Sequence, residues 1–479
     1  MGNVLGRITD YHAETSHQRG KLFGRKLDRS EFPTPFKKYQ GLPVFPLPEQ
    51  PRMPRKHLDL ALQPGVQSSK CDINIVSSIC RLSCGVSRTR TYADGTVFHY
   101  RTVASAGGLY PAELYLALQN IRGIEDGLYH YSPHVHALTQ LRRGYAFSIL
   151  RGNDPIIRGY ISSIYHRSSW KYGQRAYRYC LLDAGHLLEN SILAGRLFGL
   201  PSKADLDFND RKVNDYLCLD AQYEACLAMV HFVGCSAATE VDESIVQTGD
   251  DIRQFSRSAP VAKAPSELLE AHRLTSSFAR CPVRPPAPAP EGGISLKQPV
   301  IDKRATTAIL ERRSSRNFVP RSVPAAPLKD IVSFLCLDVP PVCMDAVRVG
   351  FLAAEHSEFA PGQYRIHRPS SSYHLVQSGN YMAESARVCL DQQWLSNAAA
   401  HFVFTADIES LNKHCGPRAY RYAQLQAGRL GQRIYVAAQA KGLGACGIGA
   451  FFDDEAAGLL SLPPGQVLLY LVAVGPVQR

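Results

Sequence analysis

The sequence predicts an α+β protein built from two related domains in tandem. Three blocks of sequence each occur twice along the chain, in the same order. The blocks are RAYRY at 175–179 and 418–422, GLYHYSPHVHALTQLRRG at 127–144 with GQYRIHRPSSSYHLVQSG at 362–379, and ACLAMVHFVG at 225–234 with QVLLYLVAVG at 466–475. Repeated similarity in a fixed order indicates a tandem duplication in which each copy is one structural unit.

A linker separates the two copies. The periodic apolar pattern fades from Ser236 to about Val300, and Cys281–Pro290 carries five prolines in ten residues. Such a composition favours extended polyproline structure and does not continue a helix or a central strand. The predicted organisation is an N-terminal extension at 1–65, a first domain at 66–236, a proline-rich linker at 237–300 and a second domain at 301–479.

Each copy is predicted to contain a long helix and several buried strands. In the first copy, apolar residues recur roughly on one helical face, with Gly199 after the last of them as a stop signal. These residues are Leu181, Leu182, Leu188, Ile192, Leu193 and Leu197. The strand predictions rest on β-branched and aromatic residues at 113–118, 400–405 and 467–474.

Composition and charge exclude several classes of protein. The longest apolar run, Val467–Val474, is far shorter than the roughly 18 residues of a membrane helix, and the opening residues lack a secretory core. Basic residues exceed acidic ones by 54 − 42 = 12, but they are scattered, so we expect no nucleic-acid partner. The 13 cysteines form no CxxC pair, which predicts reduced cysteines and no metal site. We therefore expect a cytoplasmic protein without a membrane partner.

Two segments of the first copy carry candidate chemistry. RTVASAGGLYP at 101–111 has two adjacent glycines after Ser105, which let the backbone approach a flat ligand closely. The alternative is a simple turn. Lys171 and Tyr172 stand just before the first RAYRY block. A lysine in an apolar pocket loses its proton more readily and can serve as a base, whereas the alternative is an ordinary surface pair.

Two segments of the second copy carry the remaining candidates. RRSSR at 312–316 follows a predicted helix at 306–311, and its guanidinium groups suit a phosphate dianion. The alternative is a solvated basic helix end. GLGACGIGAFF at 442–452 exposes backbone amides after a long helix, but it lacks the spacing of a dinucleotide-binding Rossmann loop.

Together these segments resemble the nitroreductase-like flavoenzymes, and more narrowly the SagB/ThcOx-type peptide dehydrogenases, which oxidise azoline rings to azoles. The similarity rests on YHAET at 11–15, ASAGGLYP at 104–111, GLYHY at 127–131, KYGQRAYRY at 171–179 and DAGH at 183–186. It covers most of the first copy, and the second copy matches the wider nitroreductase pattern from about residue 303 to 475. One departure is Ala104, where the family usually has proline.

The resemblance implies tandem nitroreductase-like domains forming an internal pseudo-dimer, with FMN bound where the two domains meet. It implies Arg312, Arg313, Ser314 and Arg316 at the phosphate and ribityl end, Gly447, Gly449 and Ala450 at the N5 edge, Ser105, Ala106 and Gly107 along the ring, and an amide side chain from Gln392 or Gln393. It also implies catalytic roles for Lys171 as a buried base and for Tyr172 as its partner.

The site segments are distributed unequally between the copies. The first copy has no RRSSR, and Gly199–Phe208 stands where the second has its glycine loop. The second copy has Gly350–Phe359 in place of the serine–glycine loop and His414–Cys415 in place of Lys-Tyr. The losses are complementary, which predicts one intact composite FMN site and one decayed site.

The function implied is an FMN-dependent oxidoreductase that dehydrogenates thiazoline or oxazoline rings in a ribosomal or carrier-bound peptide, with O2 reoxidising the flavin. The expected partners are the modified peptide and a cyclodehydratase or heterocyclase complex, and the pseudo-dimer can be monomeric or form a higher oligomer. Two alternatives stay open, an NAD(P)H-dependent nitro or quinone reductase and a flavin-stabilised scaffold subunit of such a complex.

Overall fold

The computed structural model describes residues 6–22, 27–62, 71–144, 154–233, 252, 256–257, 263–276, 289–338 and 346–478. By its contacts the chain forms two compact units. The first unit consists of Lys26–Lys56 and Gln63–Leu269, and the second unit consists of Met1–Arg25, His57–Leu62 and Glu270–Arg479. Each unit contains one copy of the repeat. The predicted domain boundaries stay predictions, because much of the predicted linker, including 281–288, lies outside the described residues.

The two units contain seven-stranded sheets of the same topology, and every neighbouring pair of strands is antiparallel. In the first unit the order is β2 (Val44–Pro46), β7 (Ala137–Arg143), β6 (Gly127–Ser132), β5 (Ala112–Gln119), β8 (Ile156–Ile164), β10 (Glu224–Val233) and β9 (Lys203–Asp205). In the second it is β12 (Ile294–Ser295), β15 (Ser372–Ser378), β14 (Gly362–His367), β13 (Arg348–Ala353), β16 (Ala400–Asp407), β18 (Gln466–Gly475) and β17 (Gly444–Ile448). Strands in equal positions contain the repeated blocks, so the predicted tandem α+β fold is confirmed.

Helices complete both units. The first unit contains η1 (Arg29–Glu31), α2 (Ile73–Cys84), η2 (Ala106–Gly108), α3 (Tyr165–Tyr172), η3 (Gly173–Arg175), α4 (Ala176–Leu197) and α5 (Asp210–Tyr216), and α7 (Ser266–Thr275) crosses from the first unit into the second. The second contains α1 (Ile8–Glu14), α8 (Ala305–Glu311), α9 (Ala325–Cys336), α10 (Met382–Val388), η6 (Gln393–Asn397), α11 (Ile408–Cys415), α12 (Arg418–Ala440) and α13 (Asp453–Leu459). Capping residues set several starts: the Asp72 carboxylate accepts hydrogen bonds from the first amides of α2.

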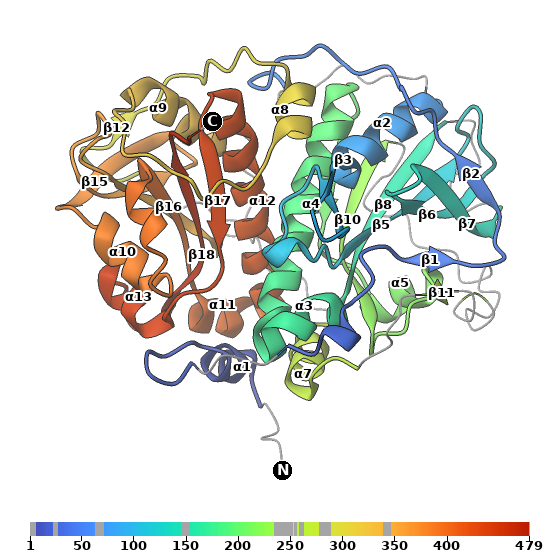
Figure 1. Ribbon diagram of the computed structural model, residues 1–479, viewed down its shortest axis with the longest axis horizontal. Coiled ribbons are helices and arrows are strands. Elements are labelled where there is room, and N and C mark those ends of the chain that lie inside the picture. Colours follow the sequence, from blue (N-terminus) through green and yellow to red (C-terminus); the bar gives the residue numbers. More distant parts are fainter. Residues whose placement is uncertain are drawn as a thin grey trace. The chain divides into compact units, whose positions relative to one another are not determined.

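The two RAYRY blocks open the longest helices, α4 and α12. Helix α4 packs on β8 and β10, and α12 packs on β17 and β18 (Figure 1). The predicted long helix is present as α4, and nearly all of its residues are buried, polar ones such as Asp183 and Glu189 included. A helix that is buried all round needs no polar stripe, and its polar side chains need partners inside the protein. The stop signal is confirmed: Gly199 follows the helix with φ 77°.

Strand positions correct one predicted equivalence between the copies. The serine–glycine loop precedes β5, whose counterpart in the second sheet is β13. Gly350–Ala353 belongs to β13 itself, so Gly350–Phe359 is not the counterpart of that loop. The counterpart is the stretch between α9 and β13, of which 339–345 lies outside the described residues. Its sequence, VPPVCMDAV at 339–347, contains no glycine, so the loss of the loop motif in the second copy still holds.

The equivalence of Lys171–Tyr172 and His414–Cys415 agrees with the local structure. Each pair ends an eight-residue helix, α3 or α11, that directly precedes a long helix. A glycine with positive φ follows each pair, Gly173 at 56° and Gly416 at 69°. The short helices therefore end in the same way, with different side chains at the last two positions.

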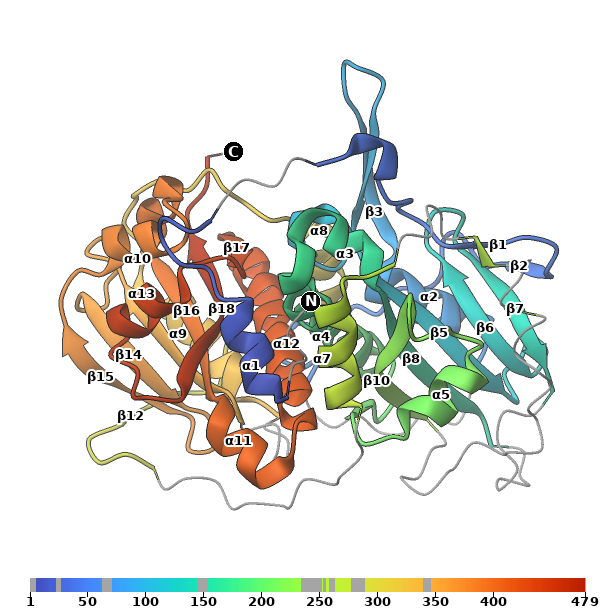
Figure 2. The same ribbon diagram turned by 90° about the horizontal axis from the view of Figure 1, so that it is seen from below.

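Two smaller, two-stranded sheets belong to the first unit. The hairpin of β3 (Val86–Thr91) and β4 (Val97–Arg101) extends away from the seven-stranded sheet of the first unit and leads into the serine–glycine loop (Figure 2). A second small sheet pairs β1 (Lys38–Tyr39) with β11 (Ser256–Arg257). No helix within the described ranges has the length and apolar character that crossing a bilayer requires.

The cysteines only partly match the prediction of reduced side chains. Nine cysteines among the described residues are free and buried. Cys415 is disulfide-bonded, which was not predicted. Across the part of the chain that the structure describes, no three His, Cys, Asp or Glu side chains gather in a way that would hold a metal ion.

Candidate functional site

The serine–glycine loop of the first unit lies between β4 and β5 and contains η2. Gly107 and Gly108 both have positive φ, 64° and 68°. A methyl group added at Gly108 would lie 2.7 Å from the Phe98 ring, and one added at Gly107 would lie 2.6 Å from Tyr172 Oη. The positive φ angles favour glycine at both positions, and an added methyl group would also displace the Tyr172 or Phe98 side chain.

Lys171 and Tyr172 lie directly against this loop. A methyl group at Gly107 would also lie 3.3 Å from Lys171 Nζ. Lys171 Nζ is 5.4 Å from the centre of the Tyr172 ring, and the ring centres of Tyr172 and Tyr179 are 4.5 Å apart. The structure thus brings together the two segments of the first copy that the sequence singled out. The buried lysine that the sequence analysis expected is not found, because Lys171 is exposed and Tyr172 is half-buried.

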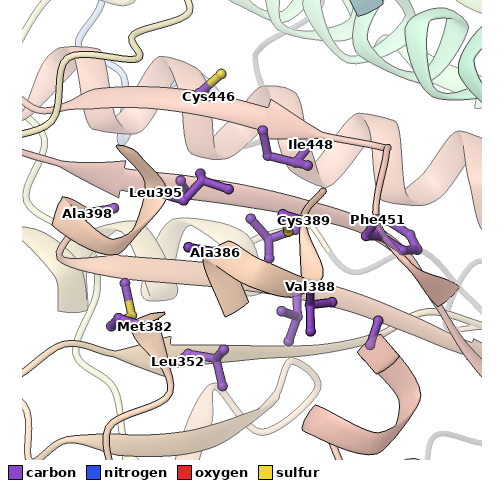
Figure 3. Packing of buried hydrophobic residues seen from close by; sticks show 14 of the residues in the cluster. Leu352, Met382, Ala386, Val388, Cys389, Leu395, Ala398, Cys446, Ile448 and Phe451 are labelled. Carbon is purple, nitrogen blue, oxygen red and sulfur yellow. The ribbon is translucent and has the colours of Figure 1, made fainter. Parts of the chain in front are cut away.

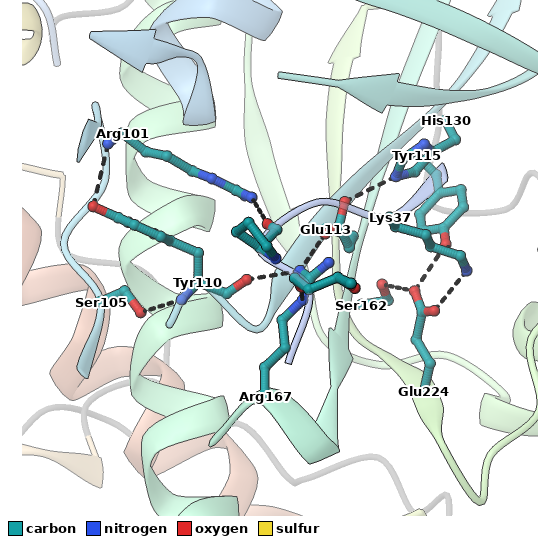
Figure 4. Close-up of polar contacts among 12 residues, drawn as sticks. Lys37, Arg101, Ser105, Tyr110, Glu113, Tyr115, His130, Ser162, Arg167 and Glu224 are labelled. Carbon is teal, nitrogen blue, oxygen red and sulfur yellow. Dashed lines mark hydrogen bonds and ion pairs between the residues drawn. The ribbon is translucent and has the colours of Figure 1, made fainter. Parts of the chain in front are cut away.

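Asp183 of α4 fixes the serine–glycine loop through hydrogen bonds. Its carboxyl group accepts hydrogen bonds from Ser105 Oγ at 2.5 Å and from the Ala106 amide at 3.1 Å. Ser105 Oγ in turn accepts a hydrogen bond from the Tyr110 amide at 2.8 Å (Figure 4). The Ser105 hydroxyl and the Ala106 amide are therefore hydrogen-bonded within the unit. We expect these residues to contact a ligand mainly through van der Waals packing.

Sequence reasoning missed this role of Asp183, which it noted only as part of the DAGH resemblance. The available signal was an acidic residue in the middle of a long apolar helix. Burial raises the pKa of Asp183 to about 7, although the hydrogen bonds from Ser105 and Ala106 favour the charged form. The Asp183 carboxyl group therefore titrates near neutral pH while it is bonded to the serine–glycine loop.

We expect Asp183 to make the stability of the protein fall as pH rises. Unfolded aspartate titrates near pH 3.9, so between about pH 4 and 7 the folded chain holds a proton that the unfolded chain has lost, and stability falls by at most about 1.4 kcal/mol per pH unit. Asp183→Asn removes this titration. Urea unfolding of both proteins across this range should show the wild type losing stability relative to the variant as pH rises, and parallel curves would contradict the assignment.

In the second unit, the RRSSR segment pairs with the glycine loop. The Ser315 amide donates to the Ala445 carbonyl at 2.9 Å. Tyr435 of α12 joins the two segments, because its hydroxyl lies 3.0 Å from Ser314 Oγ and accepts a hydrogen bond from the Gly447 amide at 2.6 Å. Burial raises the pKa of Tyr435, so its phenol stays neutral and keeps both roles. The Gly447 amide is thus engaged within the unit.

The three arginines of this segment differ in their surroundings. Arg312 is buried, with its guanidinium carbon 5.3 Å from the centre of the Tyr435 ring. Arg313 donates to the carbonyl of Leu310 at the end of α8. Arg316 is exposed, and burial raises the pKa of the Cys446 thiol while the Arg316 guanidinium beside it acts in the opposite direction. Arginine and serine donors gathered next to half-buried glycine backbone fit a phosphate-bearing cofactor such as FMN.

One hydrophobic cluster supports these segments (Figure 3). It includes Phe318 just after RRSSR, Leu395 of η6, and Cys446, Ile448 and Phe451 of the glycine loop. The core therefore positions the arginine–serine segment, the glycine loop and η6 together.

The remaining predicted residues of the second unit lie on or beside this cluster. Gln393 opens η6 and is exposed, and its neighbour Trp394 packs against the core. Gly449 and Ala450 are half-buried. Gln393, Gly449 and Ala450 remain predicted cofactor contacts, and none of the three is fully buried.

The YHAET segment packs on the second unit. Tyr11 makes an edge-to-face contact with Tyr420 of the second RAYRY block, and His12 Nδ1 lies 3.2 Å from the Tyr420 hydroxyl. Further along, His17 exchanges backbone and side-chain hydrogen bonds with Asp453, directly after the glycine loop. His17, two residues after the YHAET segment, thus fixes the end of the glycine loop.

A pocket of about 480 Å³ opens in the second unit. It is lined by Arg19, Glu384, Arg387, Val388, Glu455, Gly458 and Leu459. None of the predicted cofactor or catalytic residues lines it, so it is not the site that the sequence predicts.

With this geometry established, the family of the chain can be assigned. The pattern of the Nitroreductase family matches residues 52–234 and 309–476, one match in each copy. This chain belongs to the nitroreductase family. The recognition of a nitroreductase-like chain with two tandem domains is therefore confirmed.

The relatives include proteins named for processing trifolitoxin and microcin B17. The trifolitoxin-processing protein TfxB of Rhizobium leguminosarum is 30% identical over 29% of this chain and 40% of its own length. The microcin B17-processing protein McbC of Escherichia coli is 29% identical over 28% of this chain and 54% of its own length. The chain spans less than two thirds of the length of the curated relatives that it matches.

A solved structure shares the fold over the whole chain. The crystal structure of a nitroreductase-like protein from Anabaena variabilis is 24% identical and has a TM-score of 0.78. The match covers 98% of this chain and 99% of the other. At this identity the likeness establishes the tandem fold.

Proposed function

We propose that this nitroreductase-family chain is an FMN-dependent oxidoreductase that dehydrogenates thiazoline or oxazoline rings in a peptide. The observation that carries the proposal is the placement of Lys171 and Tyr172 against Gly107 in a loop that Asp183 holds from below. A base beside an open glycine surface suits the removal of a carbon-bound proton from a substrate that lies on a flat cofactor. The names of TfxB as a trifolitoxin-processing protein and of McbC as a microcin B17-processing protein support a peptide as substrate.

FMN is assigned to residues of both copies. Arg312, Arg313, Ser314 and Arg316 would hold its phosphate and ribityl end, and Gly449 and Ala450 would border the ring together with Gln393. Ser105, Ala106 and Gly107 would line the ring face. When bound, FMN would supply the acceptor for the hydride of the substrate, with O2 as the oxidant of the reduced flavin. The unequal distribution of motifs between the copies supports one such site per chain.

Lys171 would take the proton from the ring carbon of the substrate. That proton is acidified by the adjacent imine and carbonyl groups, so a moderate base suffices. Because Lys171 is exposed, bound cofactor and substrate have to supply the desolvation that favours its neutral form. Tyr172 lies against Lys171 and Gly107, where its hydroxyl would orient the base or relay the proton. The expected partners are the modified peptide and the heterocyclase complex that forms its rings.

The family assignment favours one alternative, an NAD(P)H-dependent nitro or quinone reductase. A synthetic peptide that contains one thiazoline ring separates the two. Under the proposal, the protein consumes O2 and the peptide loses two hydrogens by mass spectrometry. Rapid bleaching of the flavin by NADPH without change in the peptide would favour the reductase. Failure of both reactions would favour a non-catalytic scaffold subunit.

A further inference from the structure

We propose that Arg167 is a positioning residue that sets the helix carrying Lys171 at a fixed distance from the serine–glycine loop. This inference rests on the proposed function. Arg167 lies in the first turn of α3, four residues before Lys171, so the two side chains start from the same side of one short helix.

One guanidinium group joins α3 to two other segments of the chain, the stretch from Tyr110 to Glu113 and the stretch around Thr34. Arg167 Nη1 donates to the Tyr110 carbonyl at 2.8 Å and to the Glu113 carboxylate of β5. Its Nε donates to the Thr34 carbonyl at 3.0 Å. Figure 4 shows Arg167 between Tyr110 and Glu113, with Ser105 on the far side of Tyr110. Tyr110 connects Arg167 to the loop, because its carbonyl accepts a hydrogen bond from Arg167 and its amide donates one to Ser105 Oγ.

The charges explain why an arginine is needed here. The side chains of Arg167 and Glu113 are 2% and 1% exposed. Burial alone would raise the pKa of Glu113, but Arg167, His130 and Arg101 beside it outweigh burial and hold the pKa well below its usual range. His130 Nε2 lies 2.8 Å from the carboxylate. Removing Arg167 would leave this buried charge without its main partner, which strongly destabilises a fold.

Arg167 has two roles, as the charge partner of Glu113 and as the hydrogen-bonding link between segments, and a substitution by lysine separates them. Its ammonium group preserves the positive charge beside Glu113, but a point charge does not reproduce the planar fork that reaches Tyr110, Glu113 and Thr34 at once. Arg167→Lys should therefore fold and bind FMN while α3 loses its fixed distance from the loop.

The matched control is Arg142→Lys. Arg142 is likewise a buried arginine of the first unit, and it donates to the backbone carbonyls of Asp215 and Tyr216 away from the loop. It tests whether any change from arginine to lysine at a buried site has the same effect.

The first measurement uses the full flavin-loaded chain and the synthetic thiazoline peptide. We expect Arg167→Lys to lower kcat about tenfold or more, with FMN content unchanged and KM within about twofold, because the reacting groups are misplaced and the peptide still binds. In a Lys171→Ala background the same change should cause no further loss. Unchanged kcat, an equal loss in Arg142→Lys, or a full additional loss without Lys171 would each overturn the proposal.

The second measurement needs no turnover. Hydrogen exchange followed by mass spectrometry should show 102–110 and 165–172 exchanging about fivefold faster in Arg167→Lys, the effect of losing one hydrogen bond, and unchanged in Arg142→Lys. If the wild type does not oxidise the peptide, the proposed function fails, and exchange still decides the positioning role. Equal exchange in the wild type and Arg167→Lys would overturn it.

Discussion

Lys171→Ala should retain the yellow cofactor and lose dehydrogenation of the thiazoline peptide by a factor of about 10² or more, the usual scale for a general base. The physical reason is the placement of Lys171 beside Gly107, where a methyl group on the glycine would lie 3.3 Å from Lys171 Nζ. Because the side chain is exposed, its removal leaves no cavity and no buried charge, and the fold should be unaffected. Initial rates of O2 uptake and the flavin spectrum measure the two parts of this expectation.

The control for this variant is Lys212→Ala. Lys212 is an exposed lysine on α5 of the same unit and is not among the predicted site residues. It should leave both the rate and the flavin content unchanged. Full activity in Lys171→Ala would remove that lysine from the mechanism, and loss of colour would show that it serves the cofactor instead.

Arg316→Ala should weaken retention of FMN. A hydrogen bond to a charged group contributes about 1.5–3 kcal/mol, so the loss of one phosphate ligand should raise the Kd of FMN roughly 10- to 100-fold. Arg316 is exposed, so the substitution should not disturb the core that holds the segment. Fluorescence titration of the apoprotein with FMN gives the Kd directly.

Arg365→Ala is the matched control. Arg365 is an exposed arginine on β14 of the same unit. Its substitution by alanine removes one positive charge, as Arg316→Ala does, at a different position. It separates the loss of a ligand from a general change in net charge. Equal Kd values for the wild type and Arg316→Ala would refute the assignment of the phosphate.

Features that repeat along the chain could be predicted from the sequence. The two RAYRY blocks fall on α4 and α12, and the other repeated blocks fall on strands at equal positions of the two sheets. Local signals such as apolar runs and helix-ending glycines sufficed for these elements. The equivalence of Lys171–Tyr172 and His414–Cys415 could be predicted because the similarity is continuous from these residues into each RAYRY block.

Features that depend on distant parts of the chain could not be predicted. Tyr435 joins Ser314 to the glycine loop, and Asp183 holds Ser105, but each pair is far apart in sequence and no local pattern relates them. The exposure of Lys171 depends in the same way on tertiary packing. The wrong counterpart of the serine–glycine loop has another cause: the second copy has no similar sequence there, so only the strand order locates it.

The most direct test of the account is the amount of flavin that one chain binds at saturation. An absorption spectrum of the reconstituted protein, after removal of unbound FMN and with the protein measured independently, gives this ratio. The complementary motifs predict a value close to one. A value close to two would show that both copies retain a site, and protein that stays colourless after reconstitution would show that neither does.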